Sequence, residues 1–120
     1  MWVCLNNSFV SIVQHHTEPA LFVVRGRFAG DVAAFLDTNK GNESVTPDND
    51  YRYRMTANRL TVDEALKRAT AAINYTNFKD SCPTWRHEVY IRVWSVMHRA
   101  QHLALLSRGT SGALKWWREL

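Results

Sequence analysis

The stretch that decides the fold is residues 85–106, WRHEVYIRVWSVMHRAQHLALL, the longest periodic segment of the chain. Its apolar residues recur at spacings of three and four: Val89, Tyr90, Val93, Trp94, Val96, Met97, Ala100 and Ala104. This spacing places them on one face of an α-helix. The pattern therefore predicts a long helix that buries this face, with Trp94 as the most important core side chain.

The first part of the chain has the patterns of β-strands. Residues 2–5 and 9–14 (FVSIVQ) are rich in β-branched and aromatic side chains, and residues 21–27 (LFVVRGR) follow after a polar, proline-containing segment. Gly26 within the last of these strands indicates a bulge or a close approach by another part of the backbone. Residues 51–57 (YRYRMTA) alternate, which predicts one face in the core, beginning with the Tyr51 side chain.

Two further helices and one loop are expected. A short helix begins near Asp31, because an acidic side chain in the first turn interacts favourably with the helix dipole. Residues 39–50 are rich in Asn, Asp, Gly, Ser and Pro and predict a loop. Thr61 and Glu64 match a capping box. This motif predicts a helix over residues 62–75 with Thr61 as its N-cap.

These elements together predict an α+β fold. We expect an antiparallel sheet of three to four strands, with the two longer helices, 62–75 and 85–106, packed on one face. The order of elements is loosely ferredoxin-like. The expected organisation is a single domain over residues 1–109, followed by a C-terminal tail over residues 110–120.

Length and composition agree with one small intracellular domain. At 120 residues and 46% hydrophobic, the chain can bury one core. No stretch approaches the roughly 18 uninterrupted apolar residues of a membrane span, and no basic segment precedes the first apolar residues. Cys4 and Cys82 stand in unrelated contexts, so they predict no disulfide framework. We expect a cytoplasmic protein with no membrane partner.

Charge is unevenly distributed along the chain. Residues 1–60 contain six basic and six acidic side chains, whereas residues 61–120 contain nine and five, and eleven of the fifteen basic residues are arginine. Arginine favours forked contacts with carboxylates and phosphates. An acidic partner is therefore one expectation, and ordinary solvated arginines are the alternative.

Four arginines are the first candidate binding residues. They are Arg25, Arg27, Arg52 and Arg54. If their two strands are neighbours, the guanidinium groups form a patch that can grip phosphate or an acidic protein surface. The alternative is that nearby acids, Asp31, Asp50 and Glu64, neutralise them.

The C-terminal residues are the second candidate. Trp116 and Trp117 are adjacent, and the basic residues near them are Arg108, Lys115 and Arg118. Either this tail folds back as a short helix, or it presents an aromatic anchor to a partner or to a second copy in a homodimer.

No catalytic motif is evident in the sequence. It contains no GxSxG and no glycine-rich phosphate loop before a lysine. His98 and His102 stand four apart on the expected helix, but no third metal ligand is near, and no glutamate completes an HExxH motif. We therefore predict no catalytic, cofactor or metal residue and favour a non-enzymatic protein, with a small hydrolase or nuclease as the third hypothesis.

Several segments in order resemble a family of small bacterial and phage proteins that has no agreed activity. They are the initial MW, FVSIVQ, LFVVRGR, DYRYR, NYTNFKD and YIRVWSVMHR, and together they span about residues 1–100. The resemblance implies a compact protein encoded among phage accessory genes. By analogy, the leading hypothesis is a protein-binding module, a phage-encoded inhibitor of the anti-CRISPR type that docks on a bacterial defence complex. The alternative is direct nucleic-acid binding through the arginine face.

Overall fold

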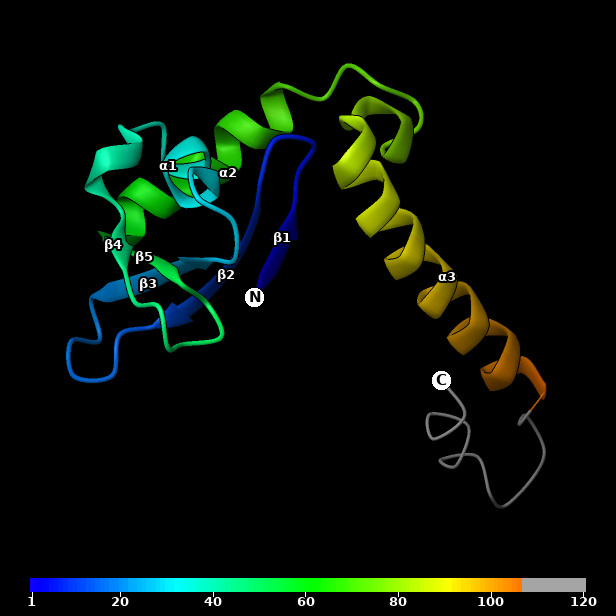
Figure 1. The fold of residues 1–120 in the computed structure, drawn as a ribbon, viewed down its shortest axis with the longest axis horizontal. Coiled ribbons are helices and arrows are strands. Elements are labelled where there is room, and N and C mark those ends of the chain that lie inside the picture. The colour runs from blue at the N-terminus through cyan, green and yellow to red at the C-terminus, as the bar shows by residue number, and fades with distance from the viewer. Residues whose placement is uncertain (107–120) are drawn as a thin grey trace. The chain divides into compact units, whose positions relative to one another are not determined.

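A computed structural model describes residues 1–106 of the chain. The chain divides into two compact units, Met1–Thr76 and Asn77–Leu120. The first unit contains a sheet with two helices, and the second contains one long helix (Figure 1).

The first unit is built on a five-stranded antiparallel sheet. Its strands are β1 (Trp2–Cys4), β2 (Phe9–Gln14), β3 (Leu21–Gly26), β4 (Ser44–Val45) and β5 (Tyr53–Asn58). Their order across the sheet is β1-β2-β3-β5-β4, and every neighbouring pair is antiparallel. The predicted α+β class is confirmed, although the sheet has five strands and not three to four.

The additional strand lies in the segment that was expected to be a loop. Within residues 39–50, Lys40–Asn42 form a 3-10 turn, η1, and Ser44–Val45 form β4. The expectation of an irregular loop was wrong here because β4 is only two residues long and pairs with β5 through its backbone, which needs no apolar pattern.

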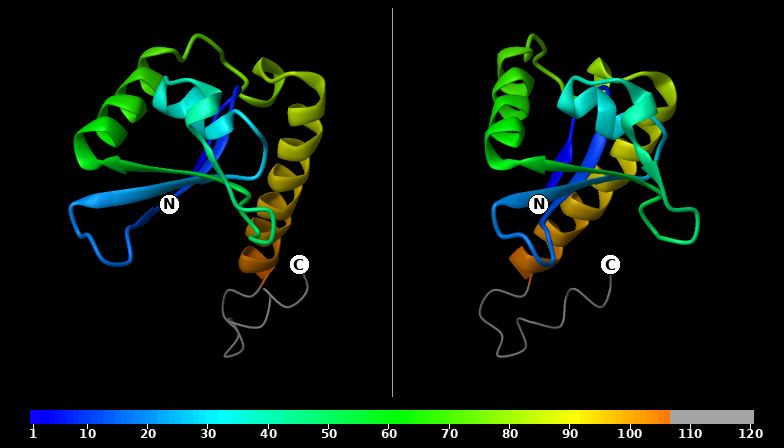
Figure 2. Two further views of the ribbon diagram at one scale, coloured as in Figure 1. Left: turned by 60° about the vertical axis from the view of Figure 1, so that its left-hand side comes forward. Right: turned by 90° about the vertical axis from the view of Figure 1, so that its left-hand side faces the viewer.

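Two helices cover the same face of the sheet (Figure 2). They are α1 (Asp31–Leu36) and α2 (Arg59–Ala71). Both contribute to a single core: Val10, Ile12, Val24, Val32, Phe35, Leu36, Ala57, Val62 and Ala65. The strand members follow the register, in which Ile12 lies opposite Val24 and Val24 lies opposite Met55. Removing these side chains from water is the main source of stability of the unit.

Gly26 allows α1 to approach the sheet closely. A Cβ atom on Gly26 would lie 3.0 Å from Cγ2 of Val32, in the first turns of α1. The sequence analysis expected a bulge or a close approach by another part of the backbone at this glycine; the close neighbour is instead the Val32 side chain, and the Val32 backbone nitrogen lies 3.7 Å away. Gly30, immediately before α1, has a φ of 90°, which side-chain-bearing residues rarely adopt.

The start of α2 differs from the sequence prediction. The helix begins at Arg59, and the side chain of Asn58 accepts a hydrogen bond from the Thr61 backbone N–H at 2.8 Å. Asn58 is therefore the N-cap, and the capping box predicted at Thr61 was wrong because Thr61 already lies in the first turn. The helix ends at Ala71 and does not reach residue 75.

The second unit consists of a short 3-10 turn, η2 (Lys79–Ser81), and α3 (Thr84–Leu106). Pro83 precedes α3, and the Phe78 ring lies 5.3 Å from the ring of Tyr90. The long helix is confirmed, and the second unit taken by itself does not bury the predicted core face of this helix. Trp94 is 49% exposed, and of the eight apolar residues in the pattern only Tyr90 is buried.

Because the second unit by itself leaves Trp94 half-exposed, the role of Trp94 as the central core residue depends on packing of α3 on the sheet and stays a prediction. Substitution of a half-exposed side chain removes less buried area than substitution of a core residue, and therefore costs less stability. The expectations that α3 packs on the sheet and that residues 1–109 form one domain stay predictions. None of the helices within residues 1–106 has the length and apolar character needed to traverse a bilayer.

Candidate functional site

The arginines of β3 and β5 meet on one face of the sheet. Arg25 lies directly opposite Arg54 in the β3–β5 register, so the two side chains share a face. It is the face opposite the core, because the neighbouring residues Val24 and Met55 point toward α1 and α2. The sequence predicted an arginine patch only if these two strands are neighbours, and β3 and β5 are neighbours in the sheet.

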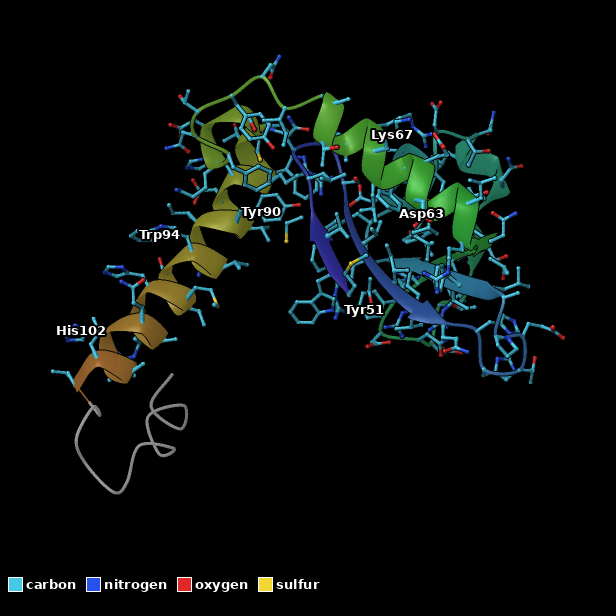
Figure 3. The ribbon with its side chains drawn as sticks, turned by 180° about the vertical axis from the view of Figure 1, so that it is seen from behind. Tyr51, Asp63, Lys67, Tyr90, Trp94 and His102 are labelled. Carbon is cyan, nitrogen blue, oxygen red and sulfur yellow. The ribbon has the colours of Figure 1, made fainter. Side chains whose placement is uncertain are left out.

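Tyr51 is the centre of this face. The guanidinium carbon of Arg25 lies 4.5 Å from the centroid of the Tyr51 ring, and that of Arg27 lies 4.2 Å from the same centroid. Arg54 donates a hydrogen bond from Nε to the Tyr51 carbonyl oxygen at 3.3 Å. We call these four residues, Arg25, Arg27, Tyr51 and Arg54, the Tyr51 cluster. In Figure 3, Tyr51 and the labelled residues of α2 lie on opposite sides of the sheet.

The burial of Tyr51 shows how tightly the cluster is packed. The residue is only 4% exposed, yet it is not a member of the apolar core between the sheet and the helices. The prediction that Tyr51 shares the core face of its strand was wrong, because β5 begins at Tyr53 and the alternation of the strand does not extend to Tyr51.

Within the described part of the chain, each guanidinium of the cluster donates one hydrogen bond. Arg25 donates to Oγ of Ser11 at 2.8 Å, and Arg27 donates to the carbonyl oxygen of Asp50 at 3.0 Å. The Nε of Arg25 is buried and has no hydrogen-bond partner among residues 1–106. Since a guanidinium has five N–H donors, most donors of the cluster are not used by the protein itself.

Arg52 is the fourth arginine of the predicted patch. Its carbonyl oxygen accepts hydrogen bonds from the backbone N–H and the hydroxyl of Thr46, while its side chain is exposed. The structure thus brings three of the four predicted arginines onto one tyrosine, and Arg52 stands beside them with an exposed side chain.

Two of the acids that were expected to neutralise the arginines accept hydrogen bonds from the backbone. The Asp50 carboxylate accepts from the Tyr51 N–H at 2.9 Å, and the Asp31 carboxylate accepts from the Phe9 N–H at 2.9 Å. Glu64 is exposed on α2, which covers the other face. Among residues 1–106, no carboxylate lies within ion-pair distance of an arginine of the Tyr51 cluster.

The same face offers weak nucleophiles. The Ser11 hydroxyl is the acceptor for Arg25, and a guanidinium is no general base. Cys4 lies on β1, and its partial burial raises the pKa of the thiol, which keeps it protonated at neutral pH. The side chains of the Tyr51 cluster are hydrogen-bond donors and carry positive charge, and the two nucleophilic groups on this face, Ser11 and Cys4, are not activated by the contacts described.

The remaining candidate residues lie elsewhere. The His98 ring is stacked on Trp94, with the centroids 4.9 Å apart and the planes at 6°. In the described part of the chain, no three His, Cys, Asp or Glu residues are grouped to hold a metal ion. Arg108, Lys115, Trp116, Trp117 and Arg118 lie outside the described residues.

Sequence reasoning found the arginines but missed the tyrosine. The signal was present in the two short patterns RGR and YRYR, which place an aromatic residue next to paired arginines. Guanidinium groups over aromatic rings are a common pairing. The pairing itself depends on which strands become neighbours.

The chain was compared with protein families, curated proteins and solved structures. No protein family, no curated protein and no solved structure matches it. The family resemblance of the short motifs stays a hypothesis, and the arguments about function rest on the geometry of the described residues.

Proposed function

We propose that the protein is a non-enzymatic binding module whose Tyr51 cluster docks on an acidic surface of a partner protein. The observation that carries the proposal is the convergence of Arg25, Arg27 and Arg54 on Tyr51 with no carboxylate in ion-pair distance among residues 1–106. Three guanidinium groups held in place, with unused donors, match the forked hydrogen-bonding geometry of carboxylates.

Preorganisation of the arginines supports this function. A solvated arginine loses rotamer freedom when it binds a partner, and that loss weakens binding. In the Tyr51 cluster, the aromatic ring and the hydrogen bonds to Ser11 and Asp50 already restrict the side chains. The entropy cost of binding is correspondingly smaller.

Direct nucleic-acid binding is the second candidate, because guanidinium groups bind phosphate as well as carboxylate. One observation favours the protein partner. Binding of single strands relies on aromatic rings exposed to stack on bases, whereas the Tyr51 ring is buried beneath Arg25 and Arg27.

An inhibitor that docks on an acidic subunit of a bacterial defence complex would be one instance of such a module. That narrower hypothesis rests on the resemblance of the sequence motifs, and the fold supports only the general anion-binding role. Capture of partners from a bacterial lysate, with and without the cluster arginines, is the experiment that would name the target.

The first prediction concerns the two cluster arginines that are most readily substituted. The double variant Arg27→Gln/Arg54→Gln should weaken binding of a labelled oligoglutamate peptide about tenfold or more, because each charged hydrogen bond contributes roughly 1.5–3 kcal/mol. Fluorescence anisotropy with the full chain at low salt measures this change.

The matched control removes the same charge from α2. Arg59 lies over the Phe22 ring, and Arg68 donates to the Phe35 carbonyl, so both are away from the cluster. Arg59→Gln/Arg68→Gln should change the affinity less than about threefold. Equal losses in the two double variants would mean that overall charge, and not the cluster, binds the peptide.

A labelled oligothymidine strand distinguishes the second candidate. If the strand binds more tightly than the peptide, and its affinity falls at least tenfold from about 50 to about 200 mM salt, the function is nucleic-acid binding. No retention of the strand at low salt removes that candidate.

A further inference from the structure

The face of the sheet that carries the Tyr51 cluster extends across all five strands of the first unit. One row of residues crosses it, each paired with the next: Trp2, Ser11, Arg25, Arg54 and Ser44. Residues directly opposite each other on antiparallel strands point to the same face. Trp2, on the edge strand β1, therefore shares a face with two arginines of the cluster. We call this face, which is opposite α1 and α2, the outer face (Figure 2).

The outer face divides into a basic half and an apolar half. The basic half consists of the Tyr51 cluster. The same register assigns five residues at the β1 side of the sheet to the apolar half: Trp2, Cys4, Phe9, Val13 and Val23. None of these five belongs to the core between the sheet and the helices. The outer face thus presents an apolar surface directly beside its positive charges.

Trp2 is held in place and yet open to solvent. The residue is 70% exposed, and its ring meets the Phe9 ring edge-on, with the centroids 6.0 Å apart and the planes at 67°. Val13, on the neighbouring strand, is 36% exposed. A supported indole offers a large apolar area and has little rotamer freedom to lose on binding, which are properties of residues that dominate binding energies.

The spacing between the two halves fits an extended peptide. Neighbouring strands lie about 4.8 Å apart, so the backbones of Trp2 and Arg25, two strands apart, are separated by about 10 Å. In an extended chain each residue adds about 3.3 Å, so residues three positions apart are separated by a similar distance. A segment with a large apolar residue three positions from an acidic one can therefore contact both halves at once.

The distribution of charge favours a protein segment over a nucleic acid. A single strand carries a phosphate on every nucleotide, and phosphates over the apolar half would meet no cation, because β1 and β2 contribute no charged residue to the outer face. A peptide can carry its acidic and apolar residues at separate positions. A second copy of the chain would bring a second set of arginines, and like charges repel.

We propose that the outer face binds an extended acidic segment of a partner protein, with the acidic residues on the Tyr51 cluster and a large apolar residue on Trp2. This inference rests on the function proposed for the Tyr51 cluster and adds an apolar anchor to it.

The test uses the full chain and two labelled, acetylated peptides that share a run of glutamates. One peptide has Phe-Gly-Gly before the glutamates, and the other has Gly-Gly-Gly. Trp2→Ser removes the indole. Leu60→Ser is the matched control, because Leu60 is 69% exposed on α2, which covers the other face of the sheet. Fluorescence anisotropy measures the affinity of each peptide.

The unsubstituted chain should bind the phenylalanine peptide about fivefold or more tightly than the glycine peptide, because contact with Trp2 removes apolar area from water. Trp2→Ser should reduce this ratio to less than about twofold and change the affinity for the glycine peptide by less than about twofold. Leu60→Ser should keep the ratio. Equal binding of the two peptides to the unsubstituted chain, or an unchanged ratio in Trp2→Ser, would overturn the inference.

The same peptides separate this inference from the function on which it rests. Arg27→Gln/Arg54→Gln should weaken binding of both peptides about tenfold and keep the ratio between them. Unchanged affinity of this variant for both peptides would overturn the function proposed for the Tyr51 cluster. Dependence on the arginines without a preference for phenylalanine would overturn the apolar anchor alone.

Three further results would identify a different occupant of the apolar half. A dimer seen in sedimentation and lost in Trp2→Ser, but not in Leu60→Ser, would show a second copy. An oligothymidine strand that binds more tightly than the phenylalanine peptide and is lost in Trp2→Ser would show a nucleic acid. Phenylalanine-peptide binding strengthened about fivefold in Trp116→Ser/Trp117→Ser would show the C-terminal residues of the same chain. Each of these results overturns the partner-segment proposal.

Discussion

Tyr51 is contacted on its ring by two cations that would otherwise repel each other. Arg25 and Arg27 lie 4.5 and 4.2 Å from its centroid, where the negative face of the aromatic ring attracts both guanidinium groups. The arrangement also leaves the Nε of Arg25 buried and without a hydrogen-bond partner from residues 1–106, and a buried donor of this kind costs about 1–3 kcal/mol. The cation–π contacts stabilise the folded chain, whereas the buried Nε of Arg25 lowers its stability.

The contribution of the ring can be measured by substitution of Tyr51. Tyr51→Leu should lower the free energy of unfolding by about 2 kcal/mol, because it removes both cation–π contacts. Tyr51→Phe keeps the ring and should change this free energy by less than about 1 kcal/mol. Urea denaturation of the full chain gives both values, and equal stability of the Leu and Phe variants would show that the cation–π contacts contribute nothing.

At the scale of elements, the start of α2 shows which of two candidate residues, Asn58 or Thr61, is the N-cap. The sequence alone does not decide between them. Asn58, Thr61 and Glu64 all stand near the helix start, and both Asn and Thr are good N-caps. Only Asn58 has the extended backbone of an N-cap, with φ of −78° and ψ of 167°.

The two residues should therefore respond differently to substitution. Asn58→Ala should cost about 1 kcal/mol of unfolding free energy, because the Thr61 N–H loses its acceptor. Thr61→Ala should cost less than about 0.5 kcal/mol, since alanine has a high helix propensity. Chemical denaturation compares the two, and a larger loss in Thr61→Ala would restore the capping box predicted from the sequence.

At the scale of the whole molecule, the apolar core lies within the first compact unit. All nine core residues are found in Met1–Thr76, and so are the five strands, α1 and α2. A unit that contains its own core has what it needs to fold cooperatively.

A chain of residues 1–76 should accordingly fold by itself. We expect a cooperative urea transition, followed by circular dichroism, and loss of that transition in Val24→Asp, which would bury a charge at a position with 0% exposure. A gradual, non-cooperative transition of the 1–76 chain would show that residues beyond 76 are required for the core.

The sequence by itself determined where most strands and helices lie. The β-branched and aromatic composition of residues 9–14, the alternation in residues 51–57 and the three-and-four spacing in residues 85–106 are local properties of the sequence, so they can be recognised without knowledge of the fold. The paired arginines could be recognised in the same way, because residues that stand two positions apart on a strand point to the same face of the sheet.

Only the tertiary structure decided which of these faces meet. The pairing of β3 with β5 set Arg25 opposite Arg54, and the turn before β5 brought the Tyr51 ring beneath Arg25 and Arg27; both are long-range events that leave no local period. The apolar spacing in α3 likewise predicted which residues share a face of the helix, but not what packs against that face. The spacing is the same in a core helix and in a helix whose Trp94 and Met97 are exposed.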